Sequence, residues 1–225
     1  MMERERSTTN LNFVRNQEIN MIKWDNCINN AHNGSIFAFS WYLDIISEDW
    51  QAIIQGDYEA VMPVLKRKKA GIHYVSPSPF ASQLGVFSTE IMDEAMVNSF
   101  IHKVFGLYRL FSVNLNKFNQ IDRDLFHQKK QTTYEFDLIR NYRLIREGYS
   151  QAIRSNIDKS KENNISILKG ITPNEFLGFI TQKGVMTSKT MNRRQLNKLR
   201  MIVAFVLKHG LGDIYAAYSG NNNLC

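Results

Sequence analysis

Two apolar runs separated by a short polar turn mark the first half of the chain. Residues 50–54 and 58–65 flank Gln55-Gly56-Asp57, and this arrangement predicts an antiparallel hairpin. The second run contains Pro63. Because proline has no N–H to donate to a neighbouring strand, we expect this residue at a sheet edge or a bulge.

Two shorter apolar segments follow, at residues 73–75 and 83–87, and each predicts a strand. Between them, Pro77-Ser78-Pro79-Phe80 must leave the sheet, since proline cannot continue the hydrogen-bonded ladder. The four cations at residues 66–69 predict a basic turn.

Helical periodicity and capping signals organise the rest of the chain. Ser40 is the expected N-cap of one helix, and Thr172-Pro173-Asn174-Glu175 forms a capping box at the start of another. The expected helices cover residues 23–33, 40–46, 89–108, 142–163, 173–182 and 190–208. Further strands are expected at residues 19–22, 110–115, 132–138, 165–168 and 213–218.

The order of these elements predicts a fold class. A strand, two helices and a strand after residue 164 repeat the order with which the chain opens. We therefore predict an α/β (α+β) fold with a mixed, mostly antiparallel sheet flanked by helices, present as one complete copy and a truncated second. The predicted domains are residues 1–140, and residues 141–225 with a connecting helix and the incomplete second copy.

Charge is unevenly distributed along the chain. The formal net charge is +7, and between Arg140 and Arg200 there are 13 Lys and Arg residues against 4 Asp and Glu residues. Such a segment attracts the phosphates of a nucleotide, of coenzyme A, of tRNA or of a lipid headgroup. A solvated helix face that serves solubility is the alternative interpretation.

Neither a membrane span nor an export signal is expected. The longest apolar run, residues 201–207, is far shorter than the ~18 residues that a transmembrane helix needs, and no apolar run follows residues 1–6. Cys27 and Cys225 lie far apart without a CxxC motif, which suits a reducing compartment and gives no sign of a zinc site. These features predict a cytoplasmic protein without a bound metal.

Four motifs carry a resemblance to a known family. They are Trp41-Tyr42-Leu43-Asp44, Val61-Met62-Pro63, Pro77-Ser78-Pro79-Phe80 and Gln83-Leu84-Gly85-Val86-Phe87. In this order they resemble the FemAB/FemX-related group of GNAT-fold (acyl-CoA N-acyltransferase-like) proteins, most closely a branch common in Bacteroidetes-type bacteria. The segment from Tyr149 to Lys159 is similar to the helix with which that group opens its second domain.

The resemblance implies two tandem GNAT-like domains that transfer an acyl group. Characterised members of the group transfer an amino acid from aminoacyl-tRNA to a peptidoglycan precursor, and others are acyl-CoA N-acyltransferases, so either donor is implied. The chain departs from the pattern because it has no Gln/Arg-x-x-Gly-x-Gly/Ala loop for the pyrophosphate of coenzyme A. Gly210-Leu211-Gly212 follows a helix, and Gln83-Leu84-Gly85 lacks the downstream glycine, so no cofactor-binding residue is assigned.

Aromatic and carboxylate side chains around residue 45 form the first candidate site. Asp44 is the candidate catalytic proton acceptor or carboxylate clamp, with a structural hydrogen bond to nearby backbone as the alternative. Trp41, Tyr42 and Trp50 are candidates to line a substrate cleft, with core packing as the alternative. No Ser/His/Asp or Cys/His arrangement is present, and the five histidines are scattered.

The interrupted sheet and the basic segment supply further candidate substrate-binding residues. Pro79, Phe80 and Gln83 lie where proline interrupts the predicted sheet, and in GNAT folds the strands splay to admit substrate, with a purely structural break as the alternative. Arg154 and Lys159 lie on a basic helix and could hold a phosphate, with a solvent-facing stripe as the alternative.

Three functions remain open. The first is an N-acyltransferase or aminoacyltransferase acting on an amine of a phosphate-bearing, cell-envelope precursor, with a small-molecule or nucleotide-linked substrate between domains. The second is a binding or scaffold module that keeps the fold without catalysis. The third is a basic nucleic-acid binder with tRNA as its partner. An unfinished sheet edge would also favour a homodimer.

Overall fold

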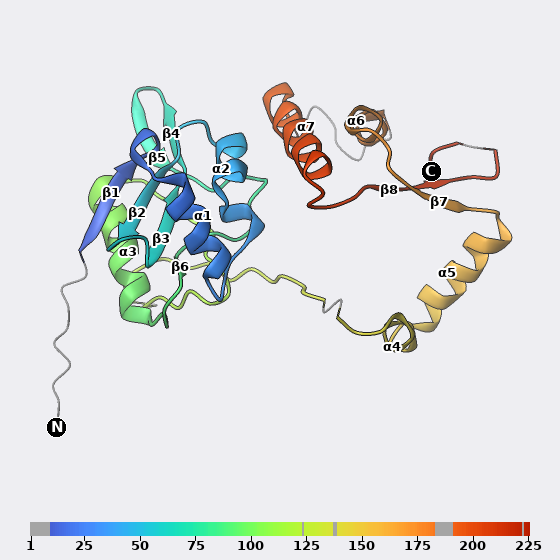
Figure 1. Cartoon of the computed structure of the whole chain (residues 1–225), viewed down its shortest axis with the longest axis horizontal. Coiled ribbons are helices and arrows are strands. Elements are labelled where there is room, and N and C mark those ends of the chain that lie inside the picture. The colour runs from blue at the N-terminus through green and yellow to red at the C-terminus, as the bar shows by residue number, and fades with distance from the viewer. Residues whose placement is uncertain (1–9, 123, 137–138, 183–190, 222) are drawn as a thin grey trace. The chain divides into compact units, whose positions relative to one another are not determined.

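The predicted hairpin is the centre of a four-stranded antiparallel sheet in the computed structural model (Figure 1). Its strands are β2 (Gln51–Gln55) and β3 (Ala60–Val64). Strand β1 (Leu11–Arg15) pairs with β2, and the short β6 (Phe87–Ser88) pairs with β3, giving the order β1-β2-β3-β6. The fold is of the mixed α+β class, as predicted.

The structure describes residues 10–122, 124–136, 139–182, 191–221 and 223–225. The chain divides into two units, Met1–Gln128 (unit 1) and Lys129–Cys225 (unit 2). The boundary predicted from the sequence lies after residue 140. Each unit is described separately below.

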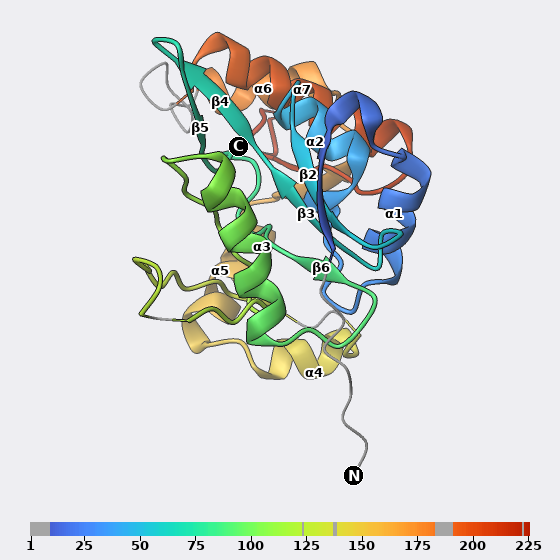
Figure 2. The ribbon, with the colours of Figure 1, turned by 90° about the vertical axis from the view of Figure 1, so that its left-hand side faces the viewer.

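Helices cover both faces of the sheet in unit 1, which explains why the apolar runs are continuous rather than alternating (Figure 2). Residues 60–64 of β3 are all buried. One face packs on α3 (Glu94–Leu107), and the other lies beneath α1 (Met21–Asn30) and α2 (Ser40–Ile46).

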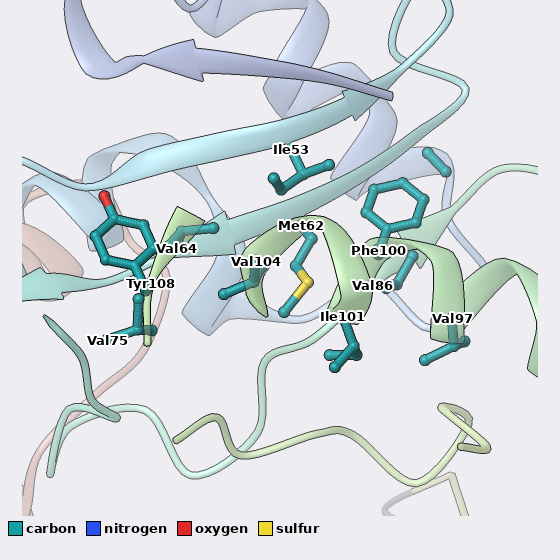
Figure 3. Packing of buried hydrophobic residues seen from close by; sticks show 11 residues of the cluster. Ile53, Met62, Val64, Val75, Val86, Val97, Phe100, Ile101, Val104 and Tyr108 are labelled. Atoms are coloured by element: carbon teal, nitrogen blue, oxygen red, sulfur yellow. The ribbon is translucent and has the colours of Figure 1, made fainter. Parts of the chain in front are cut away.

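The face toward α3 forms a hydrophobic cluster (Figure 3). Because Ile53 and Met62 are opposite each other in the register of β2 and β3, both point to the same side, where Phe100 of α3 is fully buried. The other members labelled in Figure 3 are Val64, Val75, Val86, Val97, Ile101, Val104 and Tyr108.

Two predictions about the first helices are wrong. Residues 19–22 do not form a strand, because the Asn20 side chain caps α1 by accepting a hydrogen bond from Lys23 N at 3.1 Å. Ser40 is the first residue of α2 and not its cap. The Asp25 carboxylate takes that role from a neighbouring helix, accepting hydrogen bonds from Ser40 N and Ser40 Oγ, both at 2.7 Å.

The predicted basic turn is also wrong. Residues 66–69 form strand β4 (Lys66–Lys69), which pairs with β5 (Ile72–Val75) as a separate two-stranded ribbon. The turn is Ala70-Gly71, where both residues have positive φ angles (48° and 82°), the geometry of a two-residue hairpin loop. Four consecutive cations are compatible with a strand here because a two-stranded ribbon leaves them accessible to water.

Pro63 confirms the expectation of a sheet edge. Strand β6 pairs only with Ala60 and Val61, so on the side away from β2 nothing in the sheet lies beside the second half of β3. Residues 110–115 make only isolated parallel bridges, Val75 with Phe111 and Leu84 with Leu115, rather than the predicted strand. Residues 132–136 form no strand, and residues 137–138 lie outside the described chain.

Unit 2 contains two short helices followed by a strand, two helices and a strand. Its capping box is confirmed: Glu175 accepts hydrogen bonds from Thr172 N and Thr172 Oγ1, which lower the pKa of the Glu175 carboxyl. Strands β7 and β8 pair antiparallel, as β1 and β2 do in unit 1. The elements are α4 (Tyr142–Glu147), α5 (Gln151–Glu162), β7 (Ser166–Lys169), α6 (Pro173–Gln182), α7 (Arg193–Lys208) and β8 (Tyr215–Tyr218).

The two faces of α3 predict a contrast between two phenylalanines. Phe100 is fully buried, whereas Phe105 is 56% exposed. We expect Phe100→Ala to lower the free energy of unfolding by about 3–5 kcal/mol and Phe105→Ala by about 1 kcal/mol or less. Urea unfolding followed by tryptophan fluorescence measures this, because all 3 tryptophans belong to unit 1. Equal losses for the two variants would contradict the packing described.

Candidate functional site

A proline-containing loop leaves strand β5 after Val75, as predicted, and separates the β4–β5 ribbon from β6 of the four-stranded sheet. Residues 76–83 leave the line of strands after β5, and the chain returns at Leu84. A single extended segment pairs with both sides of the interruption. Ser112 N donates to Val75 O at 2.9 Å, and Asn116 N donates to Leu84 O, also at 2.9 Å.

A recess of about 10 Å³, room for about one water molecule, lies beside this loop. Pro63 contributes to its wall because β3 has no neighbouring strand there on the side away from β2. The lining is mostly apolar. It consists of Pro63, Leu65, Val75, Ser76, Pro77, Ala81, Leu84, Gly85, Ser112, Val113 and Asn114.

The loop is attached to α2 by a buried tyrosine. The hydroxyl of Tyr42 donates a hydrogen bond to Phe80 O at 2.6 Å, and only 6% of Tyr42 is exposed. Because burial disfavours the phenolate, it raises the pKa of Tyr42 to about 12. Tyr42 therefore holds the loop as a neutral donor, and it cannot act as a base at neutral pH.

Asparagine side chains fix the point at which the chain returns to the sheet. Val86 O accepts hydrogen bonds from Asn33 Nδ2 at 2.9 Å, Asn119 Nδ2 at 3.0 Å and Asn116 Nδ2 at 3.3 Å. Val86 N donates to Asn119 Oδ1 at 2.8 Å. The sequence analysis missed these residues, although the asparagines clustered between residues 114 and 119 are a visible signal.

Gly85 is required beside this network. Its φ angle is +95°, a region that other residues adopt only with strain. A Cβ atom at this position would lie 2.0 Å from Asn119 Oδ1. The close approach of Asn119 to the backbone therefore depends on a glycine.

The structure brings Asp44 and Trp50 into contact, but this contact stabilises the core and is not part of the recess. Trp50 is fully buried, and its ring packs against Trp24 with 4.7 Å between centroids. Its indole Nε1 donates a hydrogen bond to Asp44 Oδ1 at 2.8 Å. A buried indole N–H needs an acceptor, so this bond accounts for Asp44 at the end of α2. Neither residue lines the recess.

The remaining unit 1 candidates surround the loop without lining the recess. Trp41 packs edge-on against Tyr42, with 5.3 Å between ring centroids. Pro79 is exposed, while Phe80 and Gln83 are half-buried. Tyr42 and Phe80 are joined by the hydrogen bond described above.

Arg154 and Lys159 lie on α5 of unit 2. The Arg154 guanidinium donates to Glu147 O at 2.6 Å and to Tyr149 O at 3.1 Å, so it connects α5 to the end of α4. Lys159 is exposed, and its carbonyl accepts a hydrogen bond from Asn163 Nδ2 at 2.8 Å. Arg154 thus has a local structural role in addition to any ligand contact.

Comparison with known proteins found no matching family model, no matching curated protein and no matching solved structure. In the part of the chain that the structure describes, no three His, Cys, Asp or Glu side chains are grouped as metal ligands. No described helix combines the length and the apolar character needed to cross a bilayer. The candidate site is therefore argued from the geometry of the chain alone.

Alanine substitutions at two glycines test whether the backbone at residue 85 requires a glycine. Gly85→Ala should lower the free energy of unfolding by about 2–3 kcal/mol, because the side chain imposes strain at positive φ and collides with Asn119. Gly106→Ala, on α3 with open space around it, should instead stabilise by about 0.5–1 kcal/mol. Both values come from urea unfolding. Tolerance of alanine at residue 85 would contradict the described backbone.

The Tyr42 tether predicts a pH dependence. Tyr42→Phe removes one buried hydrogen bond and should lower the free energy of unfolding by about 1 kcal/mol at pH 8. Since the folded-state pKa is raised from 10 to about 12, the stabilisation is complete below pH 10 and is lost as the pH rises toward 12. The difference between wild type and variant should therefore shrink above pH 10. Tyr74→Phe, whose hydroxyl has no hydrogen bond within the described chain, is the control.

Proposed function

We propose that the chain is an N-acyltransferase or aminoacyltransferase of the GNAT-related type, acting on an amine of a phosphate-bearing cell-envelope precursor. The observation that carries the proposal is the apolar recess beside the proline-containing loop of unit 1. Its apolar lining suits an acyl group, and because its volume of about 10 Å³ is that of about one water molecule, in this proposal the recess widens when the acyl group of a larger donor enters.

Acyl transfer requires a hydrogen-bond donor for the oxyanion that forms at the carbonyl. Gly85 lines the recess, and its N–H donates no hydrogen bond within the residues that the structure describes. Leu84 N and Val86 N on either side are both engaged, so the backbone around Gly85 is held in place. In this proposal the Gly85 N–H is the oxyanion donor, and Asp44 positions Trp50 rather than moving a proton.

The arrangement of unit 2 supports the proposed tandem copies. Strand, helix, helix and antiparallel strand occur in the same order in α6, α7 and their flanking strands as in α1, α2 and theirs. This likeness is the basis for proposing that unit 2 is the opening half of a second GNAT-like domain. Acyl-CoA and aminoacyl-tRNA are both retained as donors.

A binding module without catalysis is the second candidate. It is favoured because Asp44, the candidate catalytic residue, does not line the recess, and because the sequence has no loop typical of coenzyme A binding. The two functions differ in a measurable way, since a binding module would retain the ligand unchanged.

Transfer assays test the proposal. Acetyl-CoA and aminoacyl-tRNA, each with a radiolabelled acyl group, are incubated with the protein and a UDP-linked muropeptide that carries a free amine. We expect label in the muropeptide with one of the two donors. Binding of a donor without transfer would favour the binding module, and neither binding nor transfer would exclude the proposal.

A variant that blocks the recess tests whether the donor binds there. Ser112 is exposed and lines the recess, so Ser112→Phe should fill its mouth and weaken donor binding by about tenfold or more. Ser82→Phe places the same ring at an exposed position of the interrupting loop outside the lining, and it should leave binding within about twofold. Equal effects of the two substitutions would contradict this assignment.

A further inference from the structure

A second concavity of unit 1 lies where several elements of the fold end or begin. Strand β1 ends there at Arg15, β2 begins at Gln51, β4 begins at Lys66, and α3 ends just before Tyr108. Its volume is about 610 Å³, within the range of small-molecule sites. We call it the basic groove, and it is lined by Phe13, Arg15, Asp49, Gln51, Lys66, Ile72, His73, Leu107, Tyr108 and Arg109.

Cations from distant parts of the sequence meet in the basic groove. Arg15 and Arg109 are exposed, and neither guanidinium forms an ion pair with any residue that the structure describes. Lys66 is mostly buried and pairs with Asp49, the single carboxylate of the lining. His73 adds a group that can donate in either charge state. With His73 neutral, the lining carries a net charge of +2.

The uncharged polar groups of the groove are also donors. The Tyr108 hydroxyl donates to Gln51 Oε1, and both side chains are more than nine-tenths buried. Burial and the nearby Asp49 charge raise the pKa of Tyr108, so the hydroxyl remains protonated at neutral pH. With its oxygen already accepting from Tyr108, Gln51 offers a ligand mainly its NH₂ group. Apart from Asp49 and one ring nitrogen of His73, the side chains of the polar lining therefore offer mainly donors.

We infer that the basic groove binds an organic phosphate, with the phosphate held by Arg15, Lys66 and Arg109 and the apolar part of the ligand against Phe13, Ile72 and Leu107. A donor-rich site calls for a ligand rich in acceptors, and guanidinium groups match the geometry of phosphate oxygens. Arg15 and Arg109 have no ion-pair partner within the described residues and lie in the same groove as apolar side chains, which distinguishes the groove from an ordinary solvated charged surface. The inference does not depend on the proposed transfer reaction, because it rests on a different set of residues.

Calorimetric titration tests the inference in the full-length protein. Pyrophosphate and ATP are the anionic probes, and adenosine is the uncharged one, each measured at about 50 mM and about 200 mM salt. We expect ATP to bind more tightly than pyrophosphate, adenosine to bind weakly or not at all, and affinity for both anions to fall as salt rises. No binding of either anion at concentrations up to about 10 mM would overturn the inference.

Charge-neutralising variants locate the binding. Arg15→Gln and Arg109→Gln should each raise the Kd for ATP about tenfold, since each removes a charge-assisted contact. Lys103→Gln makes the same change of charge at an exposed residue of α3 outside the lining, and it should alter the Kd less than about twofold. An equal effect of Lys103→Gln would show attraction to overall charge and would overturn the site.

Removing a negative charge from the groove should have the opposite effect on the affinity for ATP. Asp49→Asn removes the only carboxylate and releases Lys66, so it should lower the Kd for ATP several-fold. Weaker binding in this variant would contradict the inference. A single-stranded RNA that binds more tightly than ATP, with the same loss in Arg15→Gln and Arg109→Gln, would replace the organic phosphate by nucleic acid. Circular dichroism of each variant confirms that the fold is retained.

Discussion

Burial of both faces of the β2–β3 hairpin is the constraint on which unit 1 depends. Ile53 and Met62 face α3, while neighbouring residues face α1 and α2, so every side chain of β3 is removed from water. Each face needs a helical cover, and the covers bring α2 and α3 to opposite sides of one sheet. The basic groove includes the start of β2 and the end of α3, and the recess includes Pro63 near the end of β3.

A sheet covered on both faces can be opened only within its plane. Pro63 has no N–H for a further strand, β6 begins only at Phe87 opposite Val61, and the loop of residues 76–83 is in no strand. The opening persists because Tyr42 holds the loop outward and asparagine amides hold the returning chain at Val86. These hydrogen bonds hold the backbone around the apolar recess in place.

The recess and the basic groove differ in the chemistry of their linings. The recess offers apolar surface and an unpaired Gly85 N–H, whereas the basic groove offers cations and donors. Both adjoin the β4–β5 ribbon, since Val75 lines the first, and Lys66 and His73 line the second. If both proposals hold, the acyl and phosphate parts of one substrate would bind within unit 1, and Arg154 and Lys159 of unit 2 would not be needed.

Local sequence determined the elements whose signals lie within a few residues. The hairpin of residues 51–64 follows from its two apolar runs, α6 from the Thr172–Glu175 capping box, and the break after Val75 from its prolines. Tertiary structure alone decided that Lys66–Lys69 is a strand, that Asp25 caps α2, and that Trp50 is core rather than cleft. It also gathered Arg15, Lys66 and Arg109 into one groove. Periodicity reports which side of an element is apolar, but contacts between residues tens of positions apart depend on how the elements pack, and no local pattern records that.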